Sequence, residues 1–391
     1  MKPLNKVLIL SGDISGNLGD RAIFLAICKE MRRANPLVKI SAVSENRTAE
    51  KLSGACVIPK GPRGLVELLR TALGCDLILC GGGGLFQDDD SLVKMPYWGM
   101  RLALLSLFRK PIVGYSLGVG PLRSASGRLF ARLAFTCMQT ISVRDPEALK
   151  TSSGLTTKPI HLVPDPALLL PSASSAEAFC VLKESGAPLD GIPLVGVALR
   201  RWFHHAKTFI PHKYAYKYRL REARGRSECD RMTRLLAQAL DAVVEKHAAH
   251  IVFMPTYNVR HEADDEICKD VLSKMRTDSK TLIRVESPRL YKAITKFFAV
   301  MLGARMHPLI LAASTGTAIV GLSYNQKFKG LFDLLGVEDH LFQIEDFVAN
   351  QRVDELTAVL SESIVNRPAF MSALSELVEK NRKFNAMAFA E

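Results

Sequence analysis

The feature of this sequence that most constrains its fold is a repeated order of short apolar run, glycine-rich turn and helical segment. The first copy is the apolar run Val7–Leu10, a turn rich in Gly, Asp and Asn, and a helical pattern over Ala22–Met31. Uninterrupted apolar runs of this length are typical of strands that helices cover on both faces. Their alternation with helical segments predicts a parallel, doubly wound α/β sheet.

The same order recurs in both halves of the chain. The first half predicts further strands at 40–43, 76–80, 112–116 and 140–144, and the second half at 194–199, 250–254, 282–285, 298–302 and 318–322. Residues 171–193 are rich in Ser, Ala, Pro and Gly and predict a boundary, and 391 residues exceed what one core usually serves. We therefore predict one domain over residues 1–175, a second over 190–350, and helices over 351–391 that pack back on the first domain.

Charge and cysteine content narrow the class of protein. The chain has 52 Lys and Arg against 39 Asp and Glu, and this net charge of +13 favours polyanions, anionic membrane surfaces or phosphorylated substrates as partners. Its eight cysteines form no C-x-x-C pair, so we expect reduced, buried thiols with neither disulfides nor zinc. No apolar run is long enough for a membrane span or a signal peptide, which predicts a cytoplasmic protein.

A polar, glycine-containing turn follows the first predicted strand. It runs from Gly12 to Arg21 and lacks the G-x-G-x-x-G spacing of a dinucleotide site. Glycines let the backbone approach a ligand, so Asp13 is a candidate base and Asn17 a candidate substrate contact. The alternative is a purely structural turn in which Asp20 caps the next helix.

Four glycines, 81–84, follow the predicted strand 76–80. Such a run is costly to order and indicates a backbone that comes close to a ligand, with Gly82 and Gly83 as candidate contacts. Of the three aspartates that follow, Asp88 is nearest the glycines and is a second candidate base. The alternative is an exposed acidic turn that caps a helix. Metal ligands usually come from separate elements, so we predict no metal site here.

Cationic side chains follow two predicted strands of the second half. Arg305 and His307 come after the strand 298–302, and Arg200 ends the strand 194–199. Open α/β sheets bind ligands at the carboxyl ends of their strands. In an extended segment Arg305 and His307 point the same way, and Pro308 suits the first turn of a helix that His307 caps. The pattern predicts a site for a compact ligand with phosphate and carboxylate groups. The alternatives are a structural histidine and surface arginines.

Two further basic features have open interpretations. Residues 203–226 are basic and aromatic, which is typical of an acceptor-side loop or of nucleic-acid binding, but no RNA-binding signature accompanies them, and we predict no nucleic-acid partner. The segments 63–70, 101–110 and 123–132 combine basic and apolar residues. They can rest on an anionic membrane, or be ordinary helices with basic solvent faces.

Six stretches together resemble the polysaccharide pyruvyl transferase family. Each is modest alone, but their order matches the family from about residue 7 to about residue 335. They are Gly12–Asp20, Gly81–Asp88, Ser142–Asp145, Asp165–Ala167, Gly303–His307 and Ser323–Lys327.

The resemblance implies a fold and a reaction. The fold is two Rossmann-like domains facing across a cleft, as in glycosyltransferase-B enzymes, and the reaction moves pyruvate from phosphoenolpyruvate onto a sugar as a ketal. Contacts to phosphoenolpyruvate carry over to Arg200, Arg305 and His307, and the spacing to Lys327 also fits. Two features depart from the family pattern: the basic insert after Trp202, and Pro308, where other small residues are usual.

The resulting hypothesis is a pyruvyl transferase with no cofactor beyond its donor substrate. Arg200 and Arg305 hold the donor's charges, which makes a metal unnecessary, and His307 is the acid or phosphate partner. Asp88 or Asp13 is the base for a sugar hydroxyl on a polysaccharide or lipid-linked precursor. Rival interpretations are a nucleotide-sugar-dependent glycosyltransferase of the same fold and a non-catalytic basic polyanion-binding protein. The oligomeric state stays open.

Overall fold

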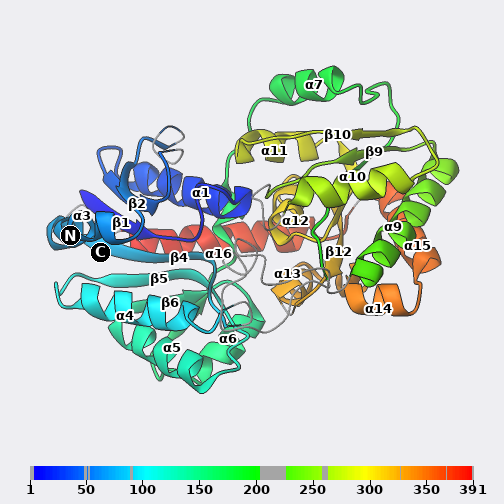
Figure 1. Ribbon diagram of the computed structural model, residues 1–391. Coiled ribbons are helices and arrows are strands. Elements are labelled where there is room, and N and C mark those ends of the chain that lie inside the picture. Colours follow the sequence, from blue (N-terminus) through cyan, green and yellow to red (C-terminus); the bar gives the residue numbers. More distant parts are fainter. Residues whose placement is uncertain are drawn as a thin grey trace. The chain divides into compact units, whose positions relative to one another are not determined.

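The computed structural model in Figure 1 describes residues 4–47, 51, 53–88, 91–202, 226–257, 263–325, 327–366 and 368–389. The chain divides into two compact units. Unit 1 contains the chain up to Leu170 and the residues from Ser375 onward, and unit 2 the described residues from Pro171 to Leu374. The basic insert up to residue 225 lies outside the described residues, as do Asp89, Asp90 and Gln326.

Unit 1 is built on a seven-stranded parallel sheet with the order β3-β2-β1-β4-β5-β6-β7. The strands are β1 (Lys6–Leu10), β2 (Lys39–Ser44), β3 (Cys56–Pro59), β4 (Leu77–Phe86), β5 (Ile112–Val119), β6 (Thr140–Val143) and β7 (Ile160–Leu162). Its helices include α1 (Leu18–Ala34), α3 (Leu65–Gly74), α4 (Lys94–Ser106), α5 (Ala125–Cys137) and α6 (Pro146–Ser153).

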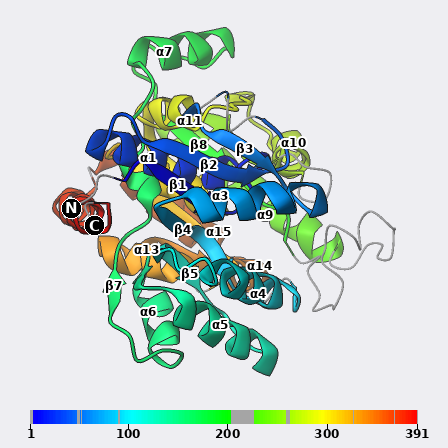
Figure 2. The same ribbon diagram turned by 90° about the vertical axis from the view of Figure 1, so that its left-hand side faces the viewer.

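Helices cover both faces of this sheet. The two views agree that α1 lies on one face and that α4, α5 and α6 lie on the other (Figures 1 and 2). On the second face Phe86 of β4 packs against Phe135 of α5, with ring centroids 5.6 Å apart. Helix α16 (Met371–Ala388) contributes Phe384 and Asn385, which contact the fully buried Tyr115 of β5. This double cover explains why the central strands read as unbroken apolar runs.

Unit 2 is built on a six-stranded parallel sheet with the order β10-β9-β8-β11-β12-β13. The strands are β8 (Leu194–Ala198), β9 (His250–Phe253), β10 (Lys280–Leu282), β11 (Phe298–Gly303), β12 (Ala318–Ser323) and β13 (Leu341–Gln343). The helices are α7 (Ser175–Glu184), α9 (Arg226–His247), α10 (Asp264–Lys274), α11 (Pro288–Thr295), α12 (Met306–Ala313), α13 (Lys327–Leu335), α14 (Ile344–Ala349) and α15 (Val353–Val365). Among the described residues, no helix has both the length and the apolarity needed to cross a membrane.

The predicted doubly wound α/β class is confirmed, and several local predictions need correction. Strand β4 continues through the glycine run instead of ending before it, and β10 begins two residues earlier than expected. The short strands β3, β7 and β13 were not predicted, and none of them is an uninterrupted run of four apolar residues. The segment taken as a boundary contains helix α7, which Ser174 caps by accepting from the backbone N–H of Glu177.

All eight cysteines are free thiols, as predicted, but not all are buried. Burial raises the pKa of Cys28 and that of Cys80 to about 12, so both stay protonated near neutral pH. Cys56 and Cys180 are exposed, and for these two the prediction of burial is wrong. Cys56 lies on β3, the edge strand of the sheet.

In each sheet two neighbouring strands mark the place from which the strand order runs outward in both directions. We call this place the switch point of the sheet. In unit 1 the chain moves outward from β1 to β2 and β3 on one side, and from β4 to β7 on the other. In unit 2 the switch point lies between β8 and β11. Ligands of open α/β sheets bind beyond the carboxyl ends of the strands at such a switch point. The topology therefore marks one candidate site in each unit.

Candidate active site

The switch point of unit 2 carries two arginines at matching positions. Ala198 of β8 and Gly303 of β11 are register partners, and the backbone N–H of Ala304 donates to Ala198 O at 2.8 Å. Arg200 and Arg305 each lie two residues beyond this pair. The prediction that both arginines lie at the carboxyl ends of strands is thus correct, and the sheet makes these strands neighbours.

The guanidinium of Arg305 is held by a buried carboxylate. Its Nε donates to Asp264 Oδ2 at 3.0 Å and its Nη2 to Asp264 Oδ1 at 2.5 Å. The Asp264 side chain is 0% exposed and that of Arg305 is 13% exposed. Asp264 also accepts from Thr256 Oγ1 at 3.1 Å and from the backbone N–H of Tyr257 at 3.0 Å. This set of bonds fixes the orientation of Arg305.

Aromatic rings surround both arginines. The Cζ atom of Arg200 lies 4.5 Å from the ring centroid of Tyr324, and Arg305 Cζ lies 5.6 Å from that of Tyr257. Trp202 packs against Tyr324 with centroids 4.7 Å apart and donates its Nε1–H to Glu345 at 2.6 Å. Stacked guanidinium groups keep their charge and a defined plane, which suits recognition of phosphate or carboxylate.

His307 and Lys327 lie at the starts of two helices beside these arginines. Helix α12 begins at Met306 with Arg305 at its N-cap, so His307 is in the first turn and is not the cap that we predicted. The expected extended segment from Arg305 to His307 is likewise wrong, because the backbone turns helical after Arg305. Lys327 opens α13, and its backbone N–H donates to Asn325 Oδ1 at 3.2 Å.

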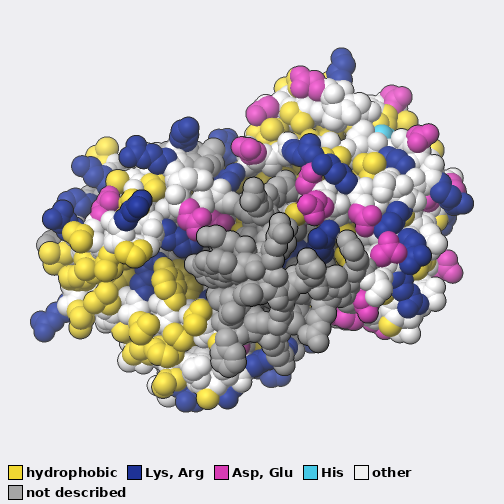
Figure 3. All heavy atoms as spheres, viewed as in Figure 1, with side chains coloured by type: hydrophobic (Ala, Val, Ile, Leu, Met, Phe, Trp, Pro, Cys, Tyr) yellow, Lys and Arg dark blue, Asp and Glu magenta, His cyan; other side chains and the backbone are white. Residues whose placement is uncertain are grey.

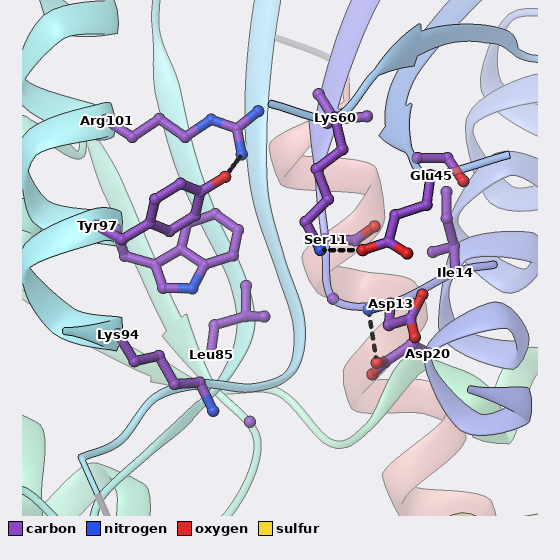
Figure 4. Close-up of a pocket in the computed structure, with 15 residues that line it drawn as sticks. Ser11, Asp13, Ile14, Asp20, Glu45, Lys60, Leu85, Lys94, Tyr97 and Arg101 are labelled. Atoms are coloured by element: carbon purple, nitrogen blue, oxygen red, sulfur yellow. Dashed lines mark hydrogen bonds and ion pairs between the residues drawn. The ribbon is translucent and has the colours of Figure 1, made fainter. Parts of the chain in front are cut away.

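The switch point of unit 1 borders a pocket of about 250 Å³ (Figure 4). Carboxylates of Asp13, Asp20 and Glu45 lie on one side of it, and Lys94, Tyr97 and Arg101 of α4 lie on the other. Lys60 reaches Glu45 Oε1 at 3.2 Å, and Arg101 Nη1 donates to the Tyr97 hydroxyl at 2.7 Å. The complete lining is Ser11, Gly12, Asp13, Ile14, Asp20, Val43, Ser44, Glu45, Lys60, Gly84, Leu85, Lys94, Tyr97, Trp98 and Arg101. Acidic and aromatic side chains facing one another can bind a hydroxyl-rich ligand.

The turn after β1 is organised by its own polar side chains. Asp13 Oδ1 accepts from the Ser15 hydroxyl at 2.7 Å and from the backbone N–H of Gly16 at 3.1 Å. Asn17 is the N-cap of α1, since its Oδ1 accepts from the N–H groups of Gly19 and Asp20. Asp20, which we considered as the cap, lies in the first turn and accepts from the Asp13 N–H at 2.8 Å. Of the two predicted residues, Asp13 lines the pocket and Asn17 shapes the helix start.

The predicted glycine contacts Gly82 and Gly83 approach helix α1. Both have positive φ, +73° and +87°, which favours glycine. A Cβ on Gly82 would lie 1.9 Å from Ile23 Cγ2, and one on Gly83 would lie 3.0 Å from Asp20 Oδ1. The close approach that the sequence predicts is therefore made to a helix of the same unit. A contact between these two glycines and a substrate stays a prediction, whereas Gly84 does line the pocket.

Asp88 is occupied with the start of another helix. It is 6% exposed, and its two oxygens accept from the backbone N–H groups of Arg123 and Ser124, each at 2.8 Å, and from the Ser124 hydroxyl at 2.5 Å. Ser124 in turn caps α5. Asp88 therefore bonds to the chain just before α5, and its side chain is buried, whereas the alternative assumed an exposed turn.

Two stretches that carried the family resemblance meet inside unit 1. Arg144, 4% exposed, pairs with Asp145 at 3.1 Å and with Asp165 at 3.5 Å. Asp145 caps α6, and Asp165 accepts from the backbone N–H of Ala167. These side chains link the segments that follow β6 and β7. In the described structure they therefore bond to other residues of unit 1.

Sequence reasoning missed several residues of both sites. Asp264 gave no signal because it starts a helix far along the chain from Arg305, and only the fold brings the two together. Tyr324 lies in the stretch Ser323–Lys327 that carried the family resemblance, but it was given no role, although it directly follows β12, the neighbour of β11. The basic and aromatic side of the unit 1 pocket comes from the first two turns of α4, where helical spacing alone does not separate pocket residues from others.

Solved structures with the same fold span nearly the whole chain. The UDP-GlcNAc 2-epimerase from Methanocaldococcus jannaschii is 10% identical with a TM-score of 0.61, covering 98% of this chain and 99% of that one. The enzyme of the same name from Neisseria meningitidis, bound to UDP-GlcNAc, is 12% identical with a TM-score of 0.54, covering 97% and 100%. A glycosyltransferase from Rickettsia africae is 8% identical with a TM-score of 0.53, covering 97% and 98%. No curated protein sequence matches significantly.

These neighbours define the fold as two Rossmann-like domains of the glycosyltransferase-B class, as predicted. The family model for polysaccharide pyruvyl transferase matches residues 17–326. The chain therefore belongs to the polysaccharide pyruvyl transferase family. Membership supports a transferase role in polysaccharide modification.

Proposed function

We propose that the protein transfers pyruvate from phosphoenolpyruvate to a sugar, forming a ketal. The observation that carries this proposal is the pair of arginines, Arg200 and Arg305, at matching positions of the unit 2 switch point. Phosphoenolpyruvate is a small ligand with a phosphate and a carboxylate, and two oriented guanidinium groups beside helix starts suit both groups. Nε and Nη2 of Arg305 donate to Asp264, which fixes the plane of the guanidinium that we assign to phosphoenolpyruvate.

The reaction assigned to this site proceeds in two stages. An acid, for which His307 is the candidate, protonates the methylene carbon of phosphoenolpyruvate, so that C2 becomes oxocarbenium-like. One sugar hydroxyl adds to C2 and loses its proton, the C2–O bond to phosphate breaks and inorganic phosphate leaves. A second hydroxyl of the same sugar then closes the ketal. Lys327 and the arginines offset charge on the departing phosphate.

We assign the sugar to the pocket of unit 1. Ser11 Oγ, which lines that pocket, is buried and has no hydrogen-bond partner among the described residues, and a sugar hydroxyl would supply one. Asp13 is the favoured base, since it lines the pocket while both oxygens of Asp88 accept bonds from residues 123 and 124. Tyr97 adds an amphipathic ring beside the sugar.

Tryptophan fluorescence tests the donor assignment without an acceptor. The chain has two tryptophans, Trp98 in unit 1 and Trp202 in unit 2. In a Trp98→Phe variant all tryptophan emission comes from Trp202, whose ring centroid lies 6.0 Å from Arg200 Cζ. We expect phosphoenolpyruvate to change this emission saturably, and Arg200→Ala to abolish the change. A response to UDP-GlcNAc but not to phosphoenolpyruvate would transfer the assignment to a nucleotide-sugar donor.

A further inference from the structure

The solvent side of helices α4 and α5 carries a row of apolar side chains. Val93, Tyr97, Met100, Leu104 and Leu107 recur every three or four residues and so share one side of α4 and its flanks. Their exposed fractions run from 41% for Leu104 to 74% for Leu107. Leu129 and Leu133 add exposed area on α5, the neighbour of α4. Figure 3 shows hydrophobic side chains gathered over this part of unit 1. We call these seven residues the α4–α5 face.

The charged side chains of α4, α5 and the chain between them have one sign. Between residues 91 and 144 the sequence contains no Asp or Glu and eight Lys or Arg. Arg109, Arg123, Arg128 and Arg132 of this stretch are exposed, next to the apolar row or on α5 itself. An exposed apolar row on helices that carry cations and no acidic residue suits the two attractions that a lipid surface offers, apolar burial and anionic headgroups.

We propose that the α4–α5 face binds the surface of an anionic phospholipid bilayer. The leucines and Met100 enter the boundary between headgroups and acyl chains, and the arginines contact lipid phosphates. Tyr97, with a ring that is half-exposed and a polar hydroxyl, belongs to the residue type that gathers at membrane interfaces. Several exposed apolar side chains on one surface mark an interaction site of some kind.

Charge favours a bilayer over a second copy of the chain. A symmetric dimer through this face would bring the same arginines toward each other across the interface, because an isologous contact uses the same surface twice. Like charges at close range weaken such a contact, whereas anionic headgroups compensate every one of them.

The face adjoins the pocket of unit 1, because Tyr97 belongs to both. A bilayer bound here would lie at the edge of that pocket. If the proposed function holds, the acceptor is then a sugar attached to a membrane lipid, with Lys94 and Arg101 placed for the phosphate that joins sugar to lipid. The membrane proposal itself rests on the α4–α5 face and not on the reaction.

Cosedimentation of the full chain with vesicles tests the proposal. We expect binding to phosphatidylcholine vesicles that contain phosphatidylglycerol, little binding to phosphatidylcholine alone, and weaker binding at high salt. The variant Leu104→Glu/Leu107→Glu should bind anionic vesicles at least about tenfold more weakly. Arg128→Glu/Arg132→Glu should also weaken binding. The matched control is Val365→Glu in unit 2, where Val365 is 72% exposed against 74% for Leu107.

Three outcomes would overturn the proposal. They are no binding to anionic vesicles at physiological salt, equal loss in the Val365 control, and a solution dimer that Leu104→Glu/Leu107→Glu dissociates. The circular dichroism of each variant verifies its fold, and the phosphoenolpyruvate response of Trp202 should be unchanged in all of them. Vesicle binding without that response would contradict the proposed function alone, and the response without vesicle binding would contradict the membrane proposal alone.

Discussion

The two switch points of this molecule have the same strand topology, but the residues just beyond their strands differ in size and charge. In unit 1 the register pair Leu10 and Cys80 is followed two residues later by glycines, Gly12 and Gly82. In unit 2 the register pair Ala198 and Gly303 is followed two residues later by arginines, Arg200 and Arg305. The same two positions therefore carry the smallest residue in one sheet and one of the largest in the other.

The residue type at these two positions determines what packs against the ends of the strands. The glycines let α1 come close, and a Cβ on Gly12 would lie 2.5 Å from Asp20 Oδ2. The acidic helix start then borders the pocket of unit 1. In unit 2 the arginines extend over aromatic rings, and the carboxylate of Asp264 lies beneath Arg305 instead of facing a pocket. The fold sets where a ligand can bind, and the residues just beyond the strands set the charge of that ligand.

The largest effect is expected from removing one arginine of unit 2. Arg200→Ala should lower kcat/KM for phosphoenolpyruvate by about a hundredfold to a thousandfold, because it deletes charge-assisted bonds to an anion. The neighbouring Arg201 is exposed and pairs with Glu266 at 3.4 Å, so Arg201→Ala is the matched control and should change kcat/KM little. Phosphate release in the presence of an acceptor glycan measures both. Equal losses in the two variants would show that general positive charge, and not the switch-point position, binds the donor.

The second largest effect is expected on the free energy of unfolding when Asp264, the carboxylate bonded to Arg305, is changed. Asp264→Asn should destabilise unit 2 by about 3 kcal/mol, because the largely buried guanidinium loses its countercharge. The adjacent Asp265 makes more exposed pairs with Arg284 and Lys269, and the hydrogen bond from Arg284 lowers its pKa. Asp265→Asn should cost less than about 1 kcal/mol.

Urea unfolding monitored by Trp202 emission in the Trp98→Phe background measures both aspartate variants. The same contact changes the expectation for Arg305→Ala. This variant leaves the Asp264 carboxylate buried without its guanidinium, and we expect it to lose stability as well as turnover. Equal free energies of unfolding for Asp264→Asn and Asp265→Asn would show that the buried Arg305–Asp264 pair contributes no more to stability than an exposed pair does.

A smaller effect tests the glycines of unit 1. Gly82→Ala should destabilise unit 1 by about 2 kcal/mol, from positive φ and from the clash with Ile23. Gly54 also has positive φ, +64°, but a Cβ there meets only Arg32 Nη2 at 3.7 Å, an ordinary contact, so Gly54→Ala isolates the backbone cost of about 1 kcal/mol. Unfolding monitored by Trp98 in a Trp202→Phe background gives both values. If Ile23→Ala fails to reduce the extra cost of Gly82→Ala, the clash is not its cause.

Most of the architecture could be predicted from the sequence, and the reason is local. The central strands β1, β8 and β11 are continuous apolar runs, a pattern contained in a few residues. The short strands β3 and β13 lack that pattern and depend on pairing with a neighbour. The arginines were found because they directly follow central strands. Asp264 and Arg101 were not, because their places in the two sites depend on contacts between elements that are distant in sequence.

A comparison of Asp88→Asn with Asp13→Asn separates the two candidate bases. Asp88→Asn leaves one oxygen to serve the N–H groups of Arg123 and Ser124, so it should cost about 1–2 kcal/mol of stability while kcat stays within about fivefold. Asp13→Asn should lower kcat about a hundredfold if Asp13 is the base, because an amide cannot accept the hydroxyl proton. Its stability should change less, since one amide oxygen still accepts from Ser15 and Gly16. A large loss of kcat in Asp88→Asn, with Asp13→Asn active, would move the acceptor site away from the pocket and toward the start of α5.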